Sequence, residues 1–375
     1  MRKIFILILI LHFTQLCTAQ DIKLYTALEQ INAKAIINKG LTGKGVQIGV
    51  IDAGFDGLFT WKVLRQINQS GQIKFTKNYV PDSITDFYKG NHGSWVLGYI
   101  GGKKDGYIEG LATNAEYYLV RNEYGSKDYR IEEVYLEQAL DTMYNMGIRL
   151  INISSGYTDK YADKKEKYKP SDMDGKTTYI SKVCEKYAKK GMIIIVTAGN
   201  EGDYYDFWKR YISAPADAEN VISVGATHFS LFKPDLNGKY LLKASYSGTG
   251  PKFLPYIKPD VACFSDRGCS FSTPIITGLV ATMLEMDSTL NLKQIKDILY
   301  KSSTLYPYPN NYIGYGVPDA EKVLSLLENP NTKIKFAKRV NITPFIIIPF
   351  GNYNVHIVFF LFPIIYGKIY FLPIF

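Results

Sequence analysis

Histidine and cysteine are scarce in this chain, which limits the metal sites and disulfide frameworks that it could form. The 375 residues include four histidines and four cysteines, and neither a CxxC nor an HExxH pattern occurs. Structural zinc sites need closely spaced Cys and His ligands, so we expect no zinc site and assign no metal-binding residue. Cys17 lies in residues 1–19, which are assigned below to a cleaved signal peptide. Cys184, Cys263 and Cys269 then remain. Three cysteines cannot form a complete disulfide framework, although a bridge between Cys263 and Cys269 would close a short loop.

Dense runs of basic residues are also missing, although the chain is basic overall. Lys and Arg number 44 against 35 Asp and Glu, which gives a net charge of +9. Nucleic-acid-binding proteins concentrate such charge in a stripe that neutralises phosphates, and no stripe of this kind occurs here. We therefore expect neither DNA nor RNA as a partner.

The first residues are typical of a secretory signal peptide. Arg2 and Lys3 precede an apolar run over residues 4–13, which is shorter than the roughly 20 residues that span a bilayer. Ala19 is a small residue at a plausible cleavage point, and we assign residues 1–19 to the signal. The mature protein is then expected to be secreted, periplasmic or at the cell surface.

Apolar segments of strand length alternate with segments of helical spacing between about residue 41 and residue 328. We expect strands at 45–52, 115–123, 148–156, 192–200 and 220–227, and helices at 94–100, 132–147, 179–191, 272–286 and 291–302. The polar residues 20–40 are also expected to be helical. Because several strands are apolar throughout, they fit a parallel sheet covered on both faces. The sequence predicts an α/β fold of three layers, with a mostly parallel sheet flanked by helices.

The segment GCSFSTPIITG holds two serines, Ser270 and Ser272, directly ahead of an apolar helix. A lone serine in such a place is usually a helix cap, because its oxygen accepts a hydrogen bond from a free backbone N–H group. A nucleophilic serine needs in addition a base that takes its proton and an acid that orients the base. The rest of the chain therefore decides between the two interpretations.

His92 and Asp52 are the candidates for the base and the acid. His92 precedes the apolar helix SWVLGYI, which would hold the imidazole still, although a lone histidine is more often structural. Asp52 ends an apolar strand, where an aspartate is often only a cap. A buried carboxylate needs a hydrogen-bonding partner. An imidazole N–H would satisfy it and leave the other ring nitrogen free as a base.

Asp52, His92 and Ser270 follow one another in the chain order of subtilisin, which differs from the orders of chymotrypsin and the α/β-hydrolases. The segments VIDAG, HGSWVLG and GCSFSTPIITG resemble the three catalytic motifs of the subtilisin-like serine proteases, the subtilases of peptidase family S8. The nucleophile of that family is the first serine of the third motif, which corresponds to Ser270. Ser272 corresponds to a small packing residue. The resemblance extends over roughly residues 41–328 and implies a subtilisin-like fold.

Two further segments extend the resemblance. TAGNEG resembles the oxyanion-hole segment, which implies that the Asn200 side chain and the Ser270 backbone N–H bind the developing oxyanion. INISSG resembles the substrate-binding strand, in which Ser154, Ser155 and Gly156 would pair with an extended peptide. The implied partner is thus a peptide or protein substrate, and we expect a monomer. The chemistry needs no cofactor; many subtilases bind calcium, but we assign no calcium site.

Some residues depart from the family's pattern. Cys269 stands before the nucleophile in place of the usual Thr, and Ile275 stands after it in place of a frequent His. Ala53 follows the aspartate in place of Ser or Thr, and ACFSDRG is shorter than the corresponding loop of the family. None of these changes removes a catalytic group.

The sequence therefore predicts a secreted serine endopeptidase whose catalytic domain spans residues 20–328. Its activity is expected to fall in acid with a midpoint around pH 6–7, as His92 becomes protonated. Two alternatives remain open. One is a catalytically silent subtilase fold that binds peptides, and the other is a membrane-anchored surface protein.

The C-terminal segment 329–375 contains no acidic residue. Its last part, VHIVFFLFPIIYGKIYFLPIF, is long enough for a membrane span of about 20 residues. Pro363 and Pro373 interrupt this part, and Lys368 places a charge near its end, which is expensive in lipid. Three interpretations stand: a poor membrane anchor, an added packed or disordered extension, and an aberrant end such as a shifted reading frame. Each implies that the catalytic domain does not need this segment.

Overall fold

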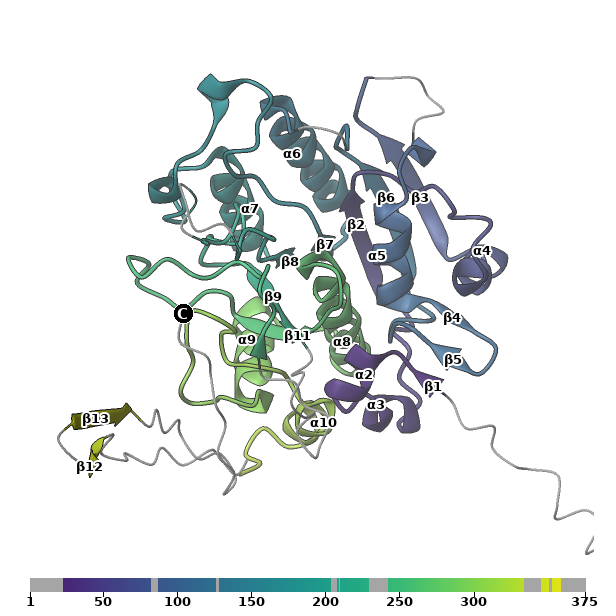
Figure 1. Cartoon of the computed structure of the whole chain (residues 1–375). Helices are drawn as coiled ribbons and strands as arrows, with labels where there is room; N and C mark the ends of the chain where they lie inside the picture. The colour runs from purple at the N-terminus through teal and green to yellow at the C-terminus, as the bar shows by residue number, and fades with distance from the viewer. Residues whose placement is uncertain are drawn as a thin grey trace, which may run out of the picture.

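The computed structural model of the chain describes residues 23–81, 87–125, 128–203, 208, 210–228 and 242–333, and the backbone of 345–350 and 353–358. Its centre is a sheet of eight strands, which Figure 1 shows. The strands are β2 (Gln47–Asp52), β3 (Ile73–Asn78), β6 (Glu116–Arg121), β7 (Leu150–Ile153), β8 (Ile193–Thr197), β9 (Ile222–His228), β10 (Leu242–Lys243) and β11 (Val261–Phe264).

The strand order places β2 in the interior of this sheet. The strands lie in the order β3, β6, β2, β7, β8 and β9, and both β10 and β11 pair with β9. Every pair is parallel except β9 with β10. Parallel strands end at the same edge of a sheet, so the polar segments that follow β2, β7 and β8 meet there. The prediction of a mostly parallel sheet is confirmed.

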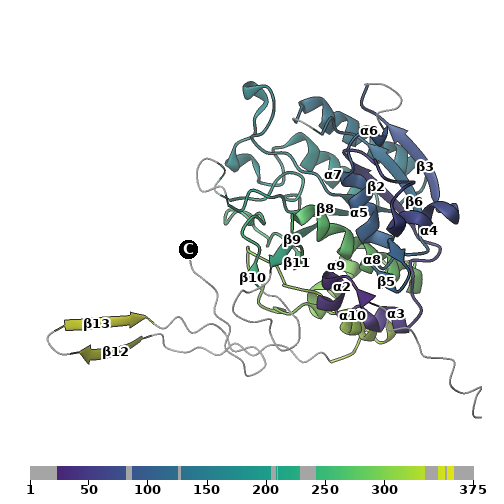
Figure 2. The ribbon, with the colours of Figure 1, turned by 45° about the vertical axis from the view of Figure 1, so that its right-hand side comes forward.

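Helices cover both faces of the sheet (Figure 1 and, turned, Figure 2). α5 (His92–Gly101) and α8 (Thr273–Met286) pack on one face, and α6 (Arg130–Asn145) and α7 (Tyr179–Lys189) pack on the other. Ile193 and Ile195 of β8 face the first pair of helices, whereas Ile194 and Val196 face the second. Because side chains alternate along a strand, the apolar run of β8 fills two cores at once. This arrangement is the predicted three-layer fold.

The helix that follows the GCSFST segment forms the centre of one core. Every residue of α8 from Thr273 to Leu284 is buried. Within the described residues, Cys269–Met286 is also the helical stretch that is long and apolar enough to cross a membrane, but 89% of it is buried inside the molecule. It is therefore a core helix. Replacing a buried leucine or isoleucine of such a helix by alanine costs about 2–5 kcal/mol.

The N-terminal part of the domain differs from its prediction. Residues 20–40 were expected to be helical, and they form two short helices, α2 (Thr26–Gln30) and α3 (Lys34–Asn38). Asn32 lies between them with φ of 58°, a left-handed conformation that a helix cannot continue through. Ahead of α2, β1 (Lys23–Leu24) pairs with β5 (Tyr107–Ile108), and β5 also pairs with β4 (Lys103–Lys104).

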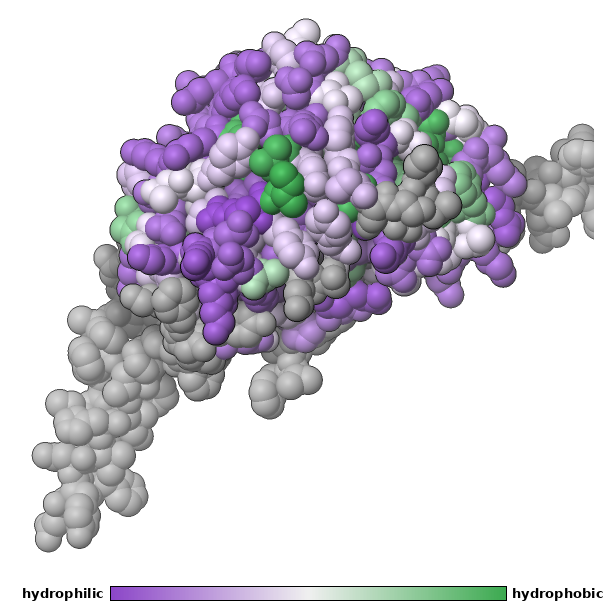
Figure 3. Space-filling model, turned by 90° about the horizontal axis from the view of Figure 1, so that it is seen from above, coloured by the Kyte–Doolittle hydropathy of each residue, from purple (hydrophilic) through white to green (hydrophobic). Residues whose placement is uncertain are grey.

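α9 (Leu292–Ser302) and α10 (Ala320–Glu328) are the last helices of the described residues, and residues 20–328 remain a predicted domain. Of the C-terminal segment, the structure describes the backbone of β12 (Phe345–Phe350) and β13 (Tyr353–Val358), which form an antiparallel pair. The other residues of that segment beyond 333, and the predicted signal peptide at 1–19, lie outside the described residues. Figure 3 shows one face of the molecule, which is mostly hydrophilic with small, separated hydrophobic groups.

Candidate active site

Strand β2 carries Asp52 at its carboxyl end, in the middle of the sheet. The carboxylate is 1% exposed, and its Oδ1 atom accepts hydrogen bonds from the backbone N–H of Ala53 at 2.8 Å and from Nδ1 of His92 at 2.7 Å. Since β2 is paired with β6 and β7 on its two sides, the position of Asp52 is fixed by the sheet. The carboxylate that the sequence proposed as the orienting acid is therefore in contact with the proposed base.

His92 is the first residue of α5, and Gly93 allows the helix to start there. The N–H of Gly93 donates to the carbonyl oxygen of Gly54 at 2.8 Å. A Cβ atom at position 93 would lie 2.7 Å from that same oxygen and 2.7 Å from the Phe55 ring. A larger residue would therefore push the start of the helix away from the loop after Asp52. The glycine holds His92 close enough to reach the carboxylate.

The pKa of His92 reflects a balance between burial and the neighbouring carboxyl groups. Burial has the largest effect and lowers the pKa, but the charge and hydrogen bond of Asp52, helped by the charge of Glu123, raise it to about 8. The sequence suggested a midpoint of pH 6–7 from the ordinary value of histidine. The structure raises the expected pH midpoint, because the contact with a buried carboxylate stabilises the imidazolium and raises the pKa of His92.

Ser270 lies in the short 3-10 helix η5 (Cys269–Phe271), which leads into α8. Its side chain is 6% exposed, and its hydroxyl donates to the backbone oxygen of Ser154 at 2.9 Å. The next residue, Phe271, places its ring 5.3 Å from the imidazole of His92. A hydroxyl has one proton to donate, so in this rotamer it is not directed at His92. The structure thus holds the Ser270 hydroxyl against the backbone that follows β7, while the next residue, Phe271, lies against His92.

Ser272 and the cysteines of this region have structural contacts. The Ser272 hydroxyl is fully buried and donates to the carbonyl oxygen of Cys269 at 3.0 Å. Cys263 donates through Sγ to the carbonyl oxygen of Ser272 at 3.3 Å. Cys184, Cys263 and Cys269 are all buried free thiols, so the bridge that the sequence left open between Cys263 and Cys269 is not formed.

Asn200 follows β8 and is anchored to the segment that carries the serine. Its Oδ1 atom accepts a hydrogen bond from the backbone N–H of Cys269 at 2.9 Å. A Cβ atom on Gly268 would lie 3.4 Å from both Nδ2 and Oδ1 of Asn200, so the amide packs directly against this glycine. The contact through Oδ1 fixes the orientation of the amide, and its Nδ2 group keeps its donor protons.

The segment Ser154–Gly156 continues from β7 beside Ser270. Within the described part of the chain, the backbone groups of Ser155 and Gly156 form no hydrogen bond with another backbone group. Pairing resumes at Tyr157, which exchanges two backbone hydrogen bonds with Ala214 at 2.8 and 3.0 Å. This leaves backbone groups that an extended peptide could pair with.

Glu123 is a residue of this region that the sequence analysis missed. It follows β6, as Asp52 ends β2, and its Oε1 atom accepts a hydrogen bond from the Tyr157 hydroxyl at 3.3 Å. Burial raises the pKa of Glu123 to about 8, with a contribution from the charge of Glu132. The available signal was its place at the carboxyl edge of the sheet, next to the strand of Asp52.

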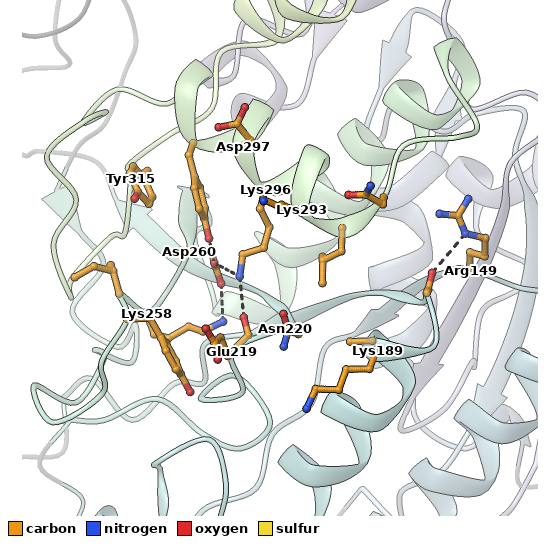
Figure 4. A pocket seen from close by; sticks show the side chains of 17 residues that line it. Arg149, Lys189, Glu219, Asn220, Lys258, Asp260, Lys293, Lys296, Asp297 and Tyr315 are labelled. Atoms are coloured by element: carbon orange, nitrogen blue, oxygen red, sulfur yellow. Dashed lines mark hydrogen bonds and ion pairs between the residues drawn. The ribbon is translucent and has the colours of Figure 1, made fainter. Parts of the chain in front are cut away.

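A separate cavity of about 860 Å³ lies at the opposite ends of the strands and is shown in Figure 4. At its floor the buried Lys258 donates to Asp260 at 2.8 Å, and Lys296 approaches the other carboxylate oxygen at 2.9 Å. Tyr300 donates to Asp260 as well, and the two lysines hold the pKa of Asp260 below its usual range although burial acts against them. These groups are hydrogen-bonded or ion-paired with one another, and they connect α9 to the sheet. Across the described residues, no group of three or more His, Cys, Asp or Glu side chains is placed to hold a metal ion.

Known proteins resemble this chain over most of the described domain. The model of the Subtilase family (Peptidase_S8) matches residues 43–316. The chain is 26% identical over 289 residues to the minor extracellular protease Epr of Bacillus subtilis (strain 168), covering 73% of this chain and 37% of Epr. It is 25% identical over 304 residues to subtilisin Savinase of Lederbergia lenta, covering 78% of this chain and 96% of Savinase.

Solved structures show the same fold. The CspB protease of Clostridium perfringens superposes with a TM-score of 0.62 at 16% identity, covering 81% of this chain and 99% of that chain. MycP1 from the ESX-1 type VII secretion system superposes with a TM-score of 0.56 at 20% identity, covering 82% of this chain and 88% of that chain. Since the family model covers well over half of the sequence and these structures share its three layers, the chain belongs to the subtilase family.

Proposed function

We propose that this protein is an extracellular serine endopeptidase that uses Asp52, His92 and Ser270. The observation that carries the proposal is the 2.7 Å hydrogen bond between His92 Nδ1 and the buried Asp52 carboxylate, with the ring of Phe271, the residue after Ser270, 5.3 Å from the imidazole. A carboxylate on one imidazole nitrogen leaves the other nitrogen free to accept a proton. Relatives that are named proteases, within a family to which the chain belongs, support the same conclusion.

Acylation begins with a rotation of the Ser270 side chain. The hydroxyl leaves the Ser154 carbonyl oxygen, to which it donates at rest, and turns towards Nε2 of His92. Its oxygen then attacks the scissile carbonyl carbon while the proton passes to His92, and Asp52 stabilises the imidazolium. The negative oxygen of the tetrahedral intermediate is bound by the Asn200 amide and the Ser270 backbone N–H.

The intermediate collapses when the C–N bond breaks and His92 returns its proton to the leaving amine. The acyl group is then an ester of Ser270. A water molecule attacks this ester and gives its proton to His92, and the second tetrahedral intermediate releases the new carboxyl terminus as Ser270 regains its proton. No step requires a metal ion or an organic cofactor.

The substrate is an extended peptide that pairs with the backbone of Ser155 and Gly156, whose groups have no backbone partner within the described residues. Pairing of this kind takes its affinity from main-chain hydrogen bonds and its selectivity from side-chain pockets. It also brings the peptide backbone to the Ser154 carbonyl oxygen that holds the resting hydroxyl. Substrate binding is thereby linked to the release of the Ser270 hydroxyl from the Ser154 carbonyl oxygen.

The test uses the secreted full chain, a casein-derived peptide mixture and a fluorophosphonate probe. Ser270→Ala is expected to abolish cleavage and labelling while the melting temperature stays nearly unchanged, since the change deletes one oxygen. Ser272→Ala is the matched control and keeps most of the activity. If the wild-type protein neither cleaves nor labels but binds peptides, it is a silent subtilase fold. If Ser272→Ala is the inactive variant, the assignment of the nucleophile is wrong.

A further inference from the structure

A lysine near the candidate oxyanion hole is held in a cage of backbone carbonyls. The Nζ atom of Lys243, at the end of β10, donates to the carbonyl oxygens of Ala244, Ser245 and Ser247, each at 2.8 Å. These three acceptors belong to one short stretch, residues 244–248, which we call the bracket loop. An ammonium group has three protons, so this cage uses all of them.

The bracket loop is joined to the segment that carries Asn200. Gly202 donates its N–H to the carbonyl oxygen of Tyr246 at 2.7 Å, and Gly248 donates to that of Gly199 at 3.1 Å. The two bonds lie on either side of Asn200 in the sequence. Contact is close, because a Cβ atom on Gly202 would lie 2.2 Å from the Ser247 oxygen. A shift of the loop would therefore move the backbone of Asn200.

The same loop supports the segment that carries the nucleophile. The Tyr246 hydroxyl donates to the carbonyl oxygen of Ser265 at 2.8 Å, and the Ser265 hydroxyl donates to that of Gly268 at 2.7 Å. The next residue, Cys269, closes the circuit through its N–H bond to Asn200. Both sides of the candidate oxyanion hole thus rest on the bracket loop.

We propose that Lys243 is a positioning residue, whose ammonium group fixes the bracket loop and thereby sets the distance between the Asn200 amide and the Ser270 backbone N–H. The inference rests on the proposed peptidase function. Three carbonyl oxygens that converge on one point need a cation or several donors between them. A neutral amine has only two N–H groups, so loss of the proton leaves one of the three carbonyl oxygens without its donor from Lys243 and loosens the loop.

The surroundings of Lys243 make its charge sensitive to alkaline pH. Burial lowers the pKa of the ammonium to about 8; the neighbouring Cys269 and Asp203 act in the opposite direction, and the charge of Arg210 lowers the pKa further. Asp203 is itself tied to the bracket loop, since it accepts a hydrogen bond from the Ser245 hydroxyl at 3.1 Å. The wild-type pH profile is then a narrow bell, limited in acid by His92 and in alkali by Lys243.

The experiment compares Lys243→Met and Lys243→Arg with the wild type as full chains, over pH 6 to 10.5, with one peptide substrate. Lys243→Met is expected to lose about 10- to 100-fold in kcat, because displacing a catalytic group by about 1 Å costs about that much, while KM changes by less than about twofold. Lys243→Arg keeps a cation at every pH, so it retains most of kcat. Its activity rises with pH to a plateau and does not fall in alkali as that of the wild type does. Lys182→Met and Lys182→Arg, on the exposed face of α7, are the matched controls and keep the bell.

Melting temperatures accompany these measurements. If Lys243→Met does not fold, the comparison between wild type and Lys243→Arg still decides, because a shared alkaline limb refutes the inference. A Lys243→Met variant with the wild-type kcat and profile, or a loss confined to KM, also overturns it while the peptidase function stands. A wild type that neither cleaves nor labels with the fluorophosphonate overturns both proposals.

Discussion

The structure allows the effect of one substitution, Asp52→Asn, to be worked out in detail. Asp52 supplies both the charge and the hydrogen bond that raise the pKa of His92 to about 8, against burial, which lowers it more than any other influence. Without the carboxylate, the pKa should return to the ordinary value of 6.5 or fall below it. The acid limb of kcat/KM is therefore expected to move down by at least about 1.5 pH units.

The rate is expected to fall far more than this change in pKa implies. A shift of about 1.5 units corresponds to roughly 2 kcal/mol of preference for the imidazolium, and solvent screening reduces that value because the His92 side chain is 38% exposed. The amide of an asparagine would also donate to Nδ1 and fix the tautomer that cannot act as a base. A loss of about 10⁴-fold in kcat is expected, about 5.4 kcal/mol.

The assay measures kcat/KM from pH 4.5 to 9 for the wild type and Asp52→Asn, with Asp105→Asn on the surface as the control. Because the His92 pKa is raised in the folded state, the pair also stabilises the protein below about pH 6.5 and loses this contribution as the pH rises through 8. The melting temperature should thus fall more at pH 6 than at pH 9. An Asp52→Asn variant that keeps more than a tenth of kcat, or an unmoved acid limb, would refute the reasoning.

Four further outcomes are expected. Asn200→Ala should lower kcat by about 10²–10³-fold with little change in KM, and an equal loss carried by KM would make it a substrate-binding residue. Gly93→Ala should reduce both activity and melting temperature, since its methyl group would lie 2.7 Å from the Gly54 oxygen; a fully active variant would contradict this geometry. Cys269→Thr should stay active, and a mild reductant should leave the wild type unaffected because all three described cysteines are free thiols. A chain ending at Glu328, where α10 ends, should fold and cleave peptides as well as the full chain, and loss of solubility would show that the later residues pack on the domain.

The central strands and helices were predictable because nearly all of their residues are buried in the core, which requires a continuous apolar sequence. β8 is apolar throughout since it is covered on both faces, and α5 and α8 are apolar since they fill a core. The edge strand β3 was missed because its sequence IKFTKN alternates exposed and half-buried residues and lacks a continuous apolar run. β11 was missed because the four residues VACF stand next to loop residues and are too short to show a period.

The residues of the candidate site also divide into those that the sequence proposed and those that it missed. Asp52, His92 and Ser270 lie in short segments whose local pattern is distinctive, so the sequence alone proposed them. Glu123 contacts Tyr157, which is distant in the chain. Lys243 binds the adjacent bracket loop, and only that loop reaches a distant part of the chain, through its bonds to Gly199 and Gly202. Nothing in a linear sequence shows that three carbonyls converge on one ammonium group, nor that burial and a carboxylate compete at His92.

The central position of α8 determines when in the life of the chain a working site can exist. The helix that follows Ser270 is buried from Thr273 to Leu284, and it packs beside α5 on one face of the sheet. During synthesis, Asp52 and His92 emerge from the ribosome long before this helix, and until it arrives the face of the sheet that α5 shares with α8 is only partly covered. Contacts over such long separations form slowly, because the loop between them must close first. Ser270 is therefore brought into place by the same event that completes the core, and a nascent or partly folded chain does not yet hold the candidate site in assembled form.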